Sequence, residues 1–190
     1  MESMMRIGDE VPDITAEVFH KGEIKNVHLS DFKGKWLILA FYPRDFTFVC
    51  PTELEDLAVN YEKFQKEDAE IISVSTDTAY VHLAWHMDSP AIGKVNYPMM
   101  ADPTGKVCKA FGTYIEEEGV SQRGTFIIDP DGILKAMDIH DNSIGRTAQE
   151  ILRKLQASRY VREHPGMVCP ANWKPGDEAM EETLDKVGKI

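Results

Sequence analysis

FYPRDFTFVCPTE, residues 41–53, joins an apolar run to an amphipathic pattern. The apolar run, residues 36–42, is typical of a β-strand that is covered on both faces, and Pro43 ends it. Downstream, a helix over about residues 50–66 is predicted by apolar residues at helical spacing: Leu54, Leu57, Ala58, Tyr61 and Phe64. Its other face is expected to consist of Glu53, Glu55, Asp56, Glu62 and Lys63. Pro51 suits a first helical turn, so Cys50 is predicted to lie at the helix N-terminus.

Cys50 is therefore a candidate nucleophile. Free amides and the positive end of the helix dipole stabilise an anion at such a position, and the thiolate is the reactive form of cysteine. Thr47 offers a hydroxyl that can bond to a bound oxygen atom, and Pro43 can shield the sulfur from water. The alternative is a buried structural cysteine, a common fate for this residue type. The nucleophile is favoured by the ordered set at the strand-to-helix turn: Pro43, Thr47, Cys50 and Pro51.

Length and charge limit the possible classes of function. A chain of 190 residues suits one domain with a sizeable core, plus an arm. Its 21 lysines and arginines stand against 32 acids, and the net charge of −11 argues against nucleic acid or an anionic membrane as the partner. The N-terminal segment has no basic start and no apolar stretch, and no run approaches about 18 apolar residues. We therefore expect a soluble, cytoplasmic protein that acts on small substrates and protein partners.

The three cysteines and six histidines show no metal-site pattern. No Cys-x-x-Cys pair is present, and the spacing of Cys50, Cys108 and Cys169 matches no common metal site. His82 and His86 lie four residues apart, but no acidic or cysteine ligand accompanies them to complete a metal site. We expect no need for metal, flavin or haem, because a cysteine can itself carry two electrons.

The middle of the chain predicts alternating strands and helices. A strand over residues 69–75 is expected to pair in parallel with strand 36–42 through a right-handed crossover. Asp77 or Thr78 can cap the next helix. The buried face of that helix is expected to consist of Tyr80, Leu83, Ala84 and Met87, with Trp85 off that face.

Later segments predict a short strand over residues 99–101, a short helix around 105–111 that packs Cys108 inward, and a hairpin of strands 125–128 and 133–139. A last long helix is marked by Ile144, Ala148, Ile151, Leu152 and Leu155. Its solvent side is expected to hold Arg146, Arg153 and Lys154. After Tyr160 the pattern ends, and residues 161–190 are interpreted as an arm that packs on another body, such as a neighbouring subunit.

The spacing P-x-x-x-T-x-x-C within residues 41–53 resembles the active-site motif of the peroxiredoxins. The resemblance extends over nearly the whole chain, through VSTDTAYVHLAW (74–85), DPTGKV (102–107), RGTFIIDPDG (123–132) and HPGMVCPANW (164–173). It is closest to the typical two-cysteine group, and within it to the bacterial alkyl hydroperoxide reductase C subunits, which share a VCPANW-like segment and a GKI-like ending. It implies a thioredoxin-like α/β fold, with a central mixed sheet flanked by helices. Residues 1–160 are then the peroxidase domain, and residues 161–190 a C-terminal arm.

The resemblance also implies residue roles. Cys50 attacks hydrogen peroxide or an organic hydroperoxide and becomes a sulfenic acid, while Thr47 and Arg123 polarise and orient the substrate. Cys169 is implied as the resolving cysteine, which forms a disulfide with Cys50 of a second subunit. A protein dithiol donor, either a flavoprotein disulfide reductase or a thioredoxin-type protein, is implied as the reductant. The family resemblance further implies a homodimer that assembles into a ring decamer.

Two other functions are compatible with such a scaffold. One is a redox-dependent chaperone or sensor, which would bind protein partners without turning over peroxide. The other is a general disulfide oxidoreductase, which the absence of a Cys-x-x-Cys pair disfavours.

Overall fold

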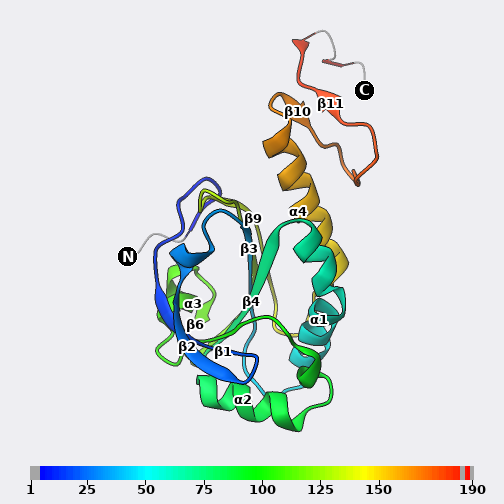
Figure 1. Ribbon diagram of the computed structural model, residues 1–190. Helices are drawn as coiled ribbons and strands as arrows, with labels where there is room; N and C mark the ends of the chain where they lie inside the picture. The colour runs from blue at the N-terminus through cyan, green and yellow to red at the C-terminus, as the bar shows by residue number, and fades with distance from the viewer. Residues whose placement is uncertain (1–4, 185–186, 189–190) are drawn as a thin grey trace.

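The computed structural model describes residues 5–184 and 187–188 (Figure 1). Within these residues the main sheet has seven strands, in the order β2-β1-β5-β4-β3-β8-β9. They are β1 (Thr15–His20), β2 (Glu23–His28), β3 (Trp36–Phe41), β4 (Ala69–Ser75), β5 (Met99–Ala101), β8 (Arg123–Ile128) and β9 (Leu134–His140). Part of the GKI-like ending, residues 189–190, lies outside the described residues.

The helices lie between and after these strands. They are α1 (Cys50–Lys66), α2 (Ala79–Asp88), α3 (Lys106–Ala110) and α4 (Ala148–Glu163), with short 3-10 helices η1 (Leu29–Phe32) and η2 (Ile92–Lys94). Two small hairpins pair β6 (Tyr114–Ile115) with β7 (Val120–Ser121) and β10 (Met167–Val168) with β11 (Met180–Glu181). None of the described helices is long and apolar enough to cross a membrane.

The predicted strand–helix–strand unit is confirmed. The expected strand 36–42 is β3, which ends at Phe41, and the expected helix 50–66 is α1. β3 pairs in parallel with β4, with Trp36 opposite Ala69. On its other side β3 pairs antiparallel with β8, which forms the predicted hairpin with β9. The sheet is therefore mixed, as expected.

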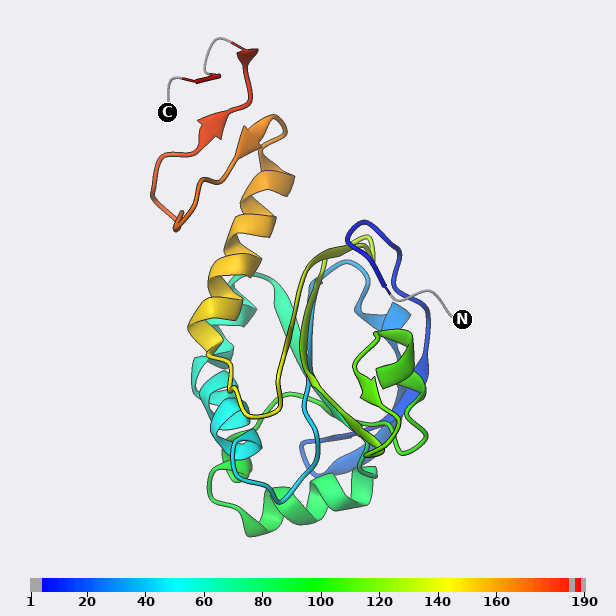
Figure 2. The ribbon, with the colours of Figure 1, turned by 180° about the vertical axis from the view of Figure 1, so that it is seen from behind.

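Strand β3 separates two cores, which explains its unbroken apolar sequence. Alternate side chains of a strand point to opposite faces. Trp36, Ile38 and Ala40 join the cluster that packs beneath α1, α2 and α4. Leu37, Leu39 and Phe41 join the opposite cluster, which includes Cys108 of α3. Figures 1 and 2 show α1 and α4 together on one side of the sheet and α3 on the other.

The predicted buried face of α2 is wrong, although its cap is as expected. Thr78 accepts a hydrogen bond from the backbone N–H of Val81 at the start of the helix. Tyr80 and Met87, which were expected inside, are 69% and 78% exposed, whereas Trp85 is buried. This short helix carries apolar residues on more than one side, so its periodicity does not select a face.

The C-terminal helix and the arm depart in detail from the predicted pattern. α4 begins at Ala148, so Ile144 precedes the helix and is exposed. It continues past Tyr160 to Glu163. The arm then forms the β10–β11 hairpin, with Val168 opposite Met180. Both views show this arm at the far end of α4, clear of the main sheet (Figures 1 and 2).

Candidate active site

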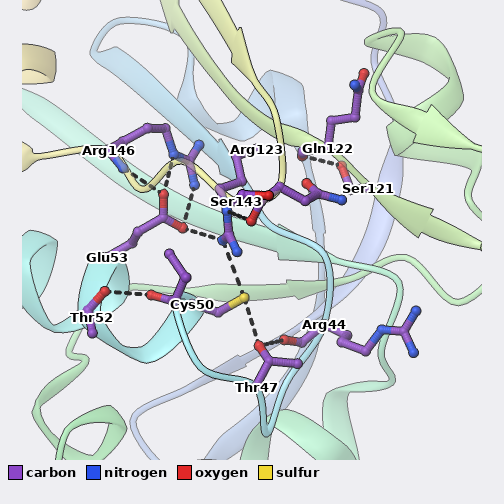
Figure 3. Close-up of polar contacts among 12 residues, drawn as sticks. Arg44, Thr47, Cys50, Thr52, Glu53, Ser121, Gln122, Arg123, Ser143 and Arg146 are labelled. Atoms are coloured by element: carbon purple, nitrogen blue, oxygen red, sulfur yellow. Dashed lines mark hydrogen bonds and ion pairs between the residues drawn. The ribbon is translucent and has the colours of Figure 1, made fainter.

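Cys50 is the first residue of α1, and its side chain is fully buried. Its Sγ lies 2.9 Å from the hydroxyl oxygen of Thr47, which also lies 2.9 Å from the carbonyl oxygen of Arg44 (Figure 3). A hydroxyl has a single hydrogen, so Thr47 donates to one of these acceptors at a time. It can therefore serve the sulfur or an oxygen atom bound beside it.

Arg123 reaches the same sulfur from the sheet. β8 lies beside β3, so the first residue of β8 is placed near the end of β3 from which the chain leads to α1. The guanidinium Nη1 lies 3.4 Å from Cys50 Sγ, and Nε donates to the carbonyl oxygen of Asn142 at 2.9 Å. The side chain is buried, which excludes the surface position that an arginine at a strand entrance often occupies. The structure thus brings Thr47 and Arg123 to the sulfur of Cys50.

Glu53 was expected on the exposed face of α1, and that prediction is wrong. Its side chain is 2% exposed and lies between two arginines. Oε2 accepts from Arg123 Nη1 at 2.7 Å, and Oε1 accepts from the Nε and backbone N–H of Arg146, each at 2.9 Å. Residues three apart on a helix share a face, so its spacing from Cys50 was the available signal for this position.

Arg146 was expected on the solvent side of the last helix, and that prediction is also wrong. It lies before α4 and is buried. Besides its bonds to Glu53, its Nη1 donates to the carbonyl oxygen of Gly124 at 2.6 Å and to the hydroxyl of Thr125 at 3.1 Å. These acceptors belong to β8, so Arg146 ties the chain before α4 to the strand that carries Arg123. No local sequence pattern indicates this contact.

The loop between β3 and α1 is held by a buried polar cluster. Pro43 is buried at its start. Asp45 accepts hydrogen bonds from the hydroxyl of Tyr42 and from Nδ1 of His82, both at 2.7 Å, and its backbone N–H donates to Asp77 at 2.8 Å. Burial raises the pKa of Asp45, whereas the hydrogen bond from His82 acts in the opposite direction. The cluster fixes the loop that carries Thr47 onto α2.

The two histidines considered as metal ligands have other partners. His82 bonds to Asp45 and to the carbonyl oxygen of Met100. Nε2 of His86 lies 3.0 Å from the carbonyl oxygen of Val95. Both rings thus serve the packing of α2.

The other two cysteines lie away from this cluster. Cys108 is fully buried in the core, as predicted, and burial raises the pKa of its thiol. Cys169 is partly buried in the arm, where its Sγ lies 3.9 Å from the carbonyl oxygen of Ala157 on α4. Burial raises the pKa of this thiol as well. The structure does not bring Cys169 to Cys50 of the same chain.

Comparison with known proteins identifies the family of the chain. Residues 7–137 match the model of the AhpC/TSA family, and residues 157–189 match the C-terminal domain of 1-Cys peroxiredoxin. The chain belongs to the AhpC/TSA family. Alkyl hydroperoxide reductase C of Pseudomonas aeruginosa is 48% identical over 98% of this chain and 100% of that protein. Alkyl hydroperoxide reductase C of Salmonella typhimurium is 46% identical, with the same coverage of both chains.

Solved AhpC/TSA relatives share the fold. The crystal structure of Enterococcus faecalis AhpC has a TM-score of 0.84 and 45% identity, covering 86% of this chain and 98% of that one. The reduced 2-Cys peroxiredoxin of Plasmodium vivax has a TM-score of 0.90 and 34% identity, covering 94% of each chain. The predicted resemblance and the thioredoxin-like fold are therefore confirmed, and the chain is a thiol-dependent peroxidase of antioxidant defence.

The buried charges beside Cys50 leave a net positive charge at this site. Arg123 and Arg146 contribute two positive charges, and Glu53 contributes one negative charge within the same buried network. The three side chains together are left with one positive charge, which a thiolate at Cys50 would balance. Unpaired buried charges are costly, so the network suits an anion at the sulfur or on an oxygen beside it.

Proposed function

We propose that the peroxidase reduces hydrogen peroxide and organic hydroperoxides at Cys50. The observation that carries this proposal is the Cys50 sulfur at a helix N-terminus, 2.9 Å from the Thr47 hydroxyl and 3.4 Å from the Arg123 guanidinium. The thiolate attacks the terminal peroxide oxygen, so that an S–O bond forms and the O–O bond breaks. Cys50 becomes a sulfenic acid, and the departing oxygen takes up a proton to leave as water or an alcohol.

Thr47 and Arg123 serve the transition state of this attack. Negative charge moves from the sulfur to the departing oxygen, and preorganised donors aimed at that charge lower the barrier. Arg123 has a planar fork of donors, so it can face the sulfur and the peroxide together. The buried Pro43 limits the access of water to the loop, which strengthens these interactions.

Cys169 is proposed as the resolving cysteine, acting on Cys50 of a second subunit. Arg146, just before α4, contacts Glu53 beside Cys50, whereas Cys169 follows the far end of that helix. The Cys169 sulfur lies against Ala157, which is nine residues into α4 and so about 14 Å along the helix from its start. The two cysteines of one chain are therefore held apart. A partner chain therefore fits better, and the functional unit is proposed to be a homodimer. Its assembly into a ring decamer rests on the resemblance to the family.

A protein dithiol is proposed to regenerate the enzyme. Its thiolate attacks the Cys50–Cys169 disulfide, and its second thiol completes the exchange. A flavoprotein disulfide reductase and a thioredoxin-type protein are the two candidates, and trying each in a coupled assay separates them. Such reductants maintain thiols in the cytoplasm, where we place the protein.

Cysteine variants test this scheme, because attack and resolution are separate steps. Cys50→Ser should abolish even one turnover. Cys169→Ser should consume about one peroxide per subunit and stop as a sulfenic acid that dimedone traps. Oxidised wild type should run as a covalent dimer on a non-reducing gel, and both variants as monomers.

Cys108→Ser is the matched control, because Cys108 is buried away from the site. It should keep both the turnover and the dimer band. A Cys169→Ser protein that retains the covalent dimer, or a Cys108→Ser protein that loses it, would assign the resolving role to the wrong cysteine.

A further inference from the structure

Two side chains of α2 contact the loop that carries Thr47. His82 and Trp85 lie three residues apart, so they share a face of the helix, and both are buried. Nδ1 of His82 lies 2.7 Å from Oδ2 of Asp45. The ring centroids of Trp85 and Phe46 lie 5.8 Å apart. The two loop residues directly before Thr47 are therefore both attached to α2.

The hydrogen bonds of His82 indicate which of its ring nitrogens carry a hydrogen. The ring is fully buried, and Nε2 lies 3.1 Å from the carbonyl oxygen of Met100, which can only accept. Nε2 therefore carries a hydrogen. Nδ1 faces Asp45, whose other oxygen accepts from the hydroxyl of Tyr42, and Asp77 accepts from the backbone N–H of Asp45. An ionised carboxylate also only accepts, which places a second hydrogen on Nδ1.

Phe46 has a strained backbone conformation. Its φ is 54°, in the left-handed region that bulky side chains rarely adopt. Such a conformation persists only where the surrounding contacts impose it. On one side of Phe46, Asp45 is bound to His82, and on the other side the Thr47 hydroxyl lies 2.9 Å from the sulfur of Cys50 (Figure 3). The turn at Phe46 therefore determines the direction in which Thr47 points.

We propose that His82 is a positioning residue for the attack on peroxide. As an imidazolium it holds Asp45, which maintains the left-handed turn at Phe46. That turn keeps the Thr47 hydroxyl at the sulfur of Cys50. This inference rests on the proposed role of Thr47 in the attack.

Loss of the bond from His82 would free the loop to change its conformation. Phe46 can then relax to a negative φ, which removes its strain. Because Thr47 follows directly, its hydroxyl moves away from the sulfur. The transition state thereby loses a preorganised donor, although Arg123 stays in place.

The first test measures the rate of Cys50 oxidation by hydrogen peroxide in stopped flow. His82→Gln keeps an amide donor near Met100 but has no donor at the position of Nδ1. It should lower the rate constant roughly 10- to 100-fold, the scale of a misplacement of about 1 Å. His82→Asn places its amide near the position of Nδ1, so it keeps a donor to Asp45 and should lose less. A larger loss in His82→Asn than in His82→Gln would assign the effect to the bond with Met100 and contradict the proposal.

His86→Gln is the matched control. It makes the same substitution on the same helix, where the ring bonds to the carbonyl oxygen of Val95 and not to the loop. Its rate constant should equal that of wild type, and circular dichroism should show that all variants keep the fold. Equal rates in His82→Gln, His86→Gln and wild type would overturn the proposal.

A double-mutant cycle tests whether His82 acts through Thr47. Thr47→Val removes the hydroxyl and keeps the shape of the side chain. In this background His82→Gln should cause no further loss of rate. An equal loss in both backgrounds would show that His82 acts by another route. If Thr47→Val alone kept the wild-type rate, the proposed role of Thr47 would fail.

The protonation of His82 has its own spectroscopic test, which does not depend on the role of Thr47. In reduced protein with ¹⁵N-labelled histidine at neutral pH, an imidazolium should give two ring N–H signals that exchange slowly with water. Their absence in His82→Gln would assign them. A single ring N–H signal from His82 in wild type would show a neutral ring and contradict the proposal.

Discussion

Nη1 of Arg123 lies 2.7 Å from Oε2 of Glu53, and Glu53 lies on α1, the helix that begins with Cys50. The same nitrogen is 3.4 Å from Cys50 Sγ. The carboxylate of Glu53 and the carbonyl oxygen of Asn142 therefore hold the guanidinium where it meets the sulfur. Arg146 donates to both carboxylate oxygens of Glu53, so a network of three buried charges positions the donor at the sulfur.

Glu53→Gln should lower kcat/KM for hydrogen peroxide on the order of 100-fold, the scale of a misplacement of about 1 Å. The amide has nearly the same shape but no charge with which to orient Arg123 and Arg146. Stopped-flow measurement of Cys50 oxidation would give the rate. Glu62→Gln makes the same change on the exposed side of α1 and should have no effect. Full activity in Glu53→Gln would show that Arg123 is positioned by other contacts.

Arg146→Lys should lower the free energy of unfolding by about 2–3 kcal/mol. Lysine keeps the charge but lacks the planar fork that serves Glu53, Gly124 and Thr125 together. Urea denaturation at a fixed protein concentration measures the change. Arg153→Lys is the control, because this partly exposed arginine was assigned to the same solvent side, and it should stay within about 0.5 kcal/mol. Equal losses in the two variants would contradict the structural role of Arg146.

Cys108 should make stability fall at alkaline pH. Burial raises the pKa of this thiol in the folded state, so the folded chain keeps its proton while the unfolded chain loses it above about pH 8.5. Its contribution is complete below that pH and declines above it, by up to about 1.4 kcal/mol per pH unit. Denaturation from pH 7 to 10 should therefore show a steeper decline for wild type than for Cys108→Ala. Parallel curves would mean that the thiol ionises equally in both states.

Tyr42→Phe should cost about 1.5–3 kcal/mol of stability, because Asp45 loses one of its two side-chain donors in a buried site. The loop that carries Thr47 should loosen as well, which a faster exchange of its amide hydrogens would report. Tyr80→Phe removes a hydroxyl from an exposed ring on α2 and serves as the control. Unchanged stability and exchange in Tyr42→Phe would show that His82 alone holds Asp45.

Local patterns determined the frame of the site. The apolar run 36–42, the proline after Cys50 and the helical spacing that follows were enough to place Cys50 at the N-terminus of α1. They also placed Thr47 one turn before it, where its hydroxyl meets the sulfur. These features depend on backbone preferences and on neighbours within a few residues, so periodicity alone can predict them.

Only the tertiary structure decided the charged network and the place of the arm. Glu53 meets Arg146 across 93 residues of sequence, and Arg123 meets Cys50 across 73. Helical periodicity assigns charged residues to the solvent side, because it considers only the spacing of apolar side chains. It takes no account of an oppositely charged residue that is distant in sequence. Burial of Glu53 becomes favourable only when two guanidiniums arrive from β8 and from the chain before α4. The separation of Cys169 from Cys50 likewise follows from where the arm packs along α4, beside Ala157, which no motif around either cysteine contains.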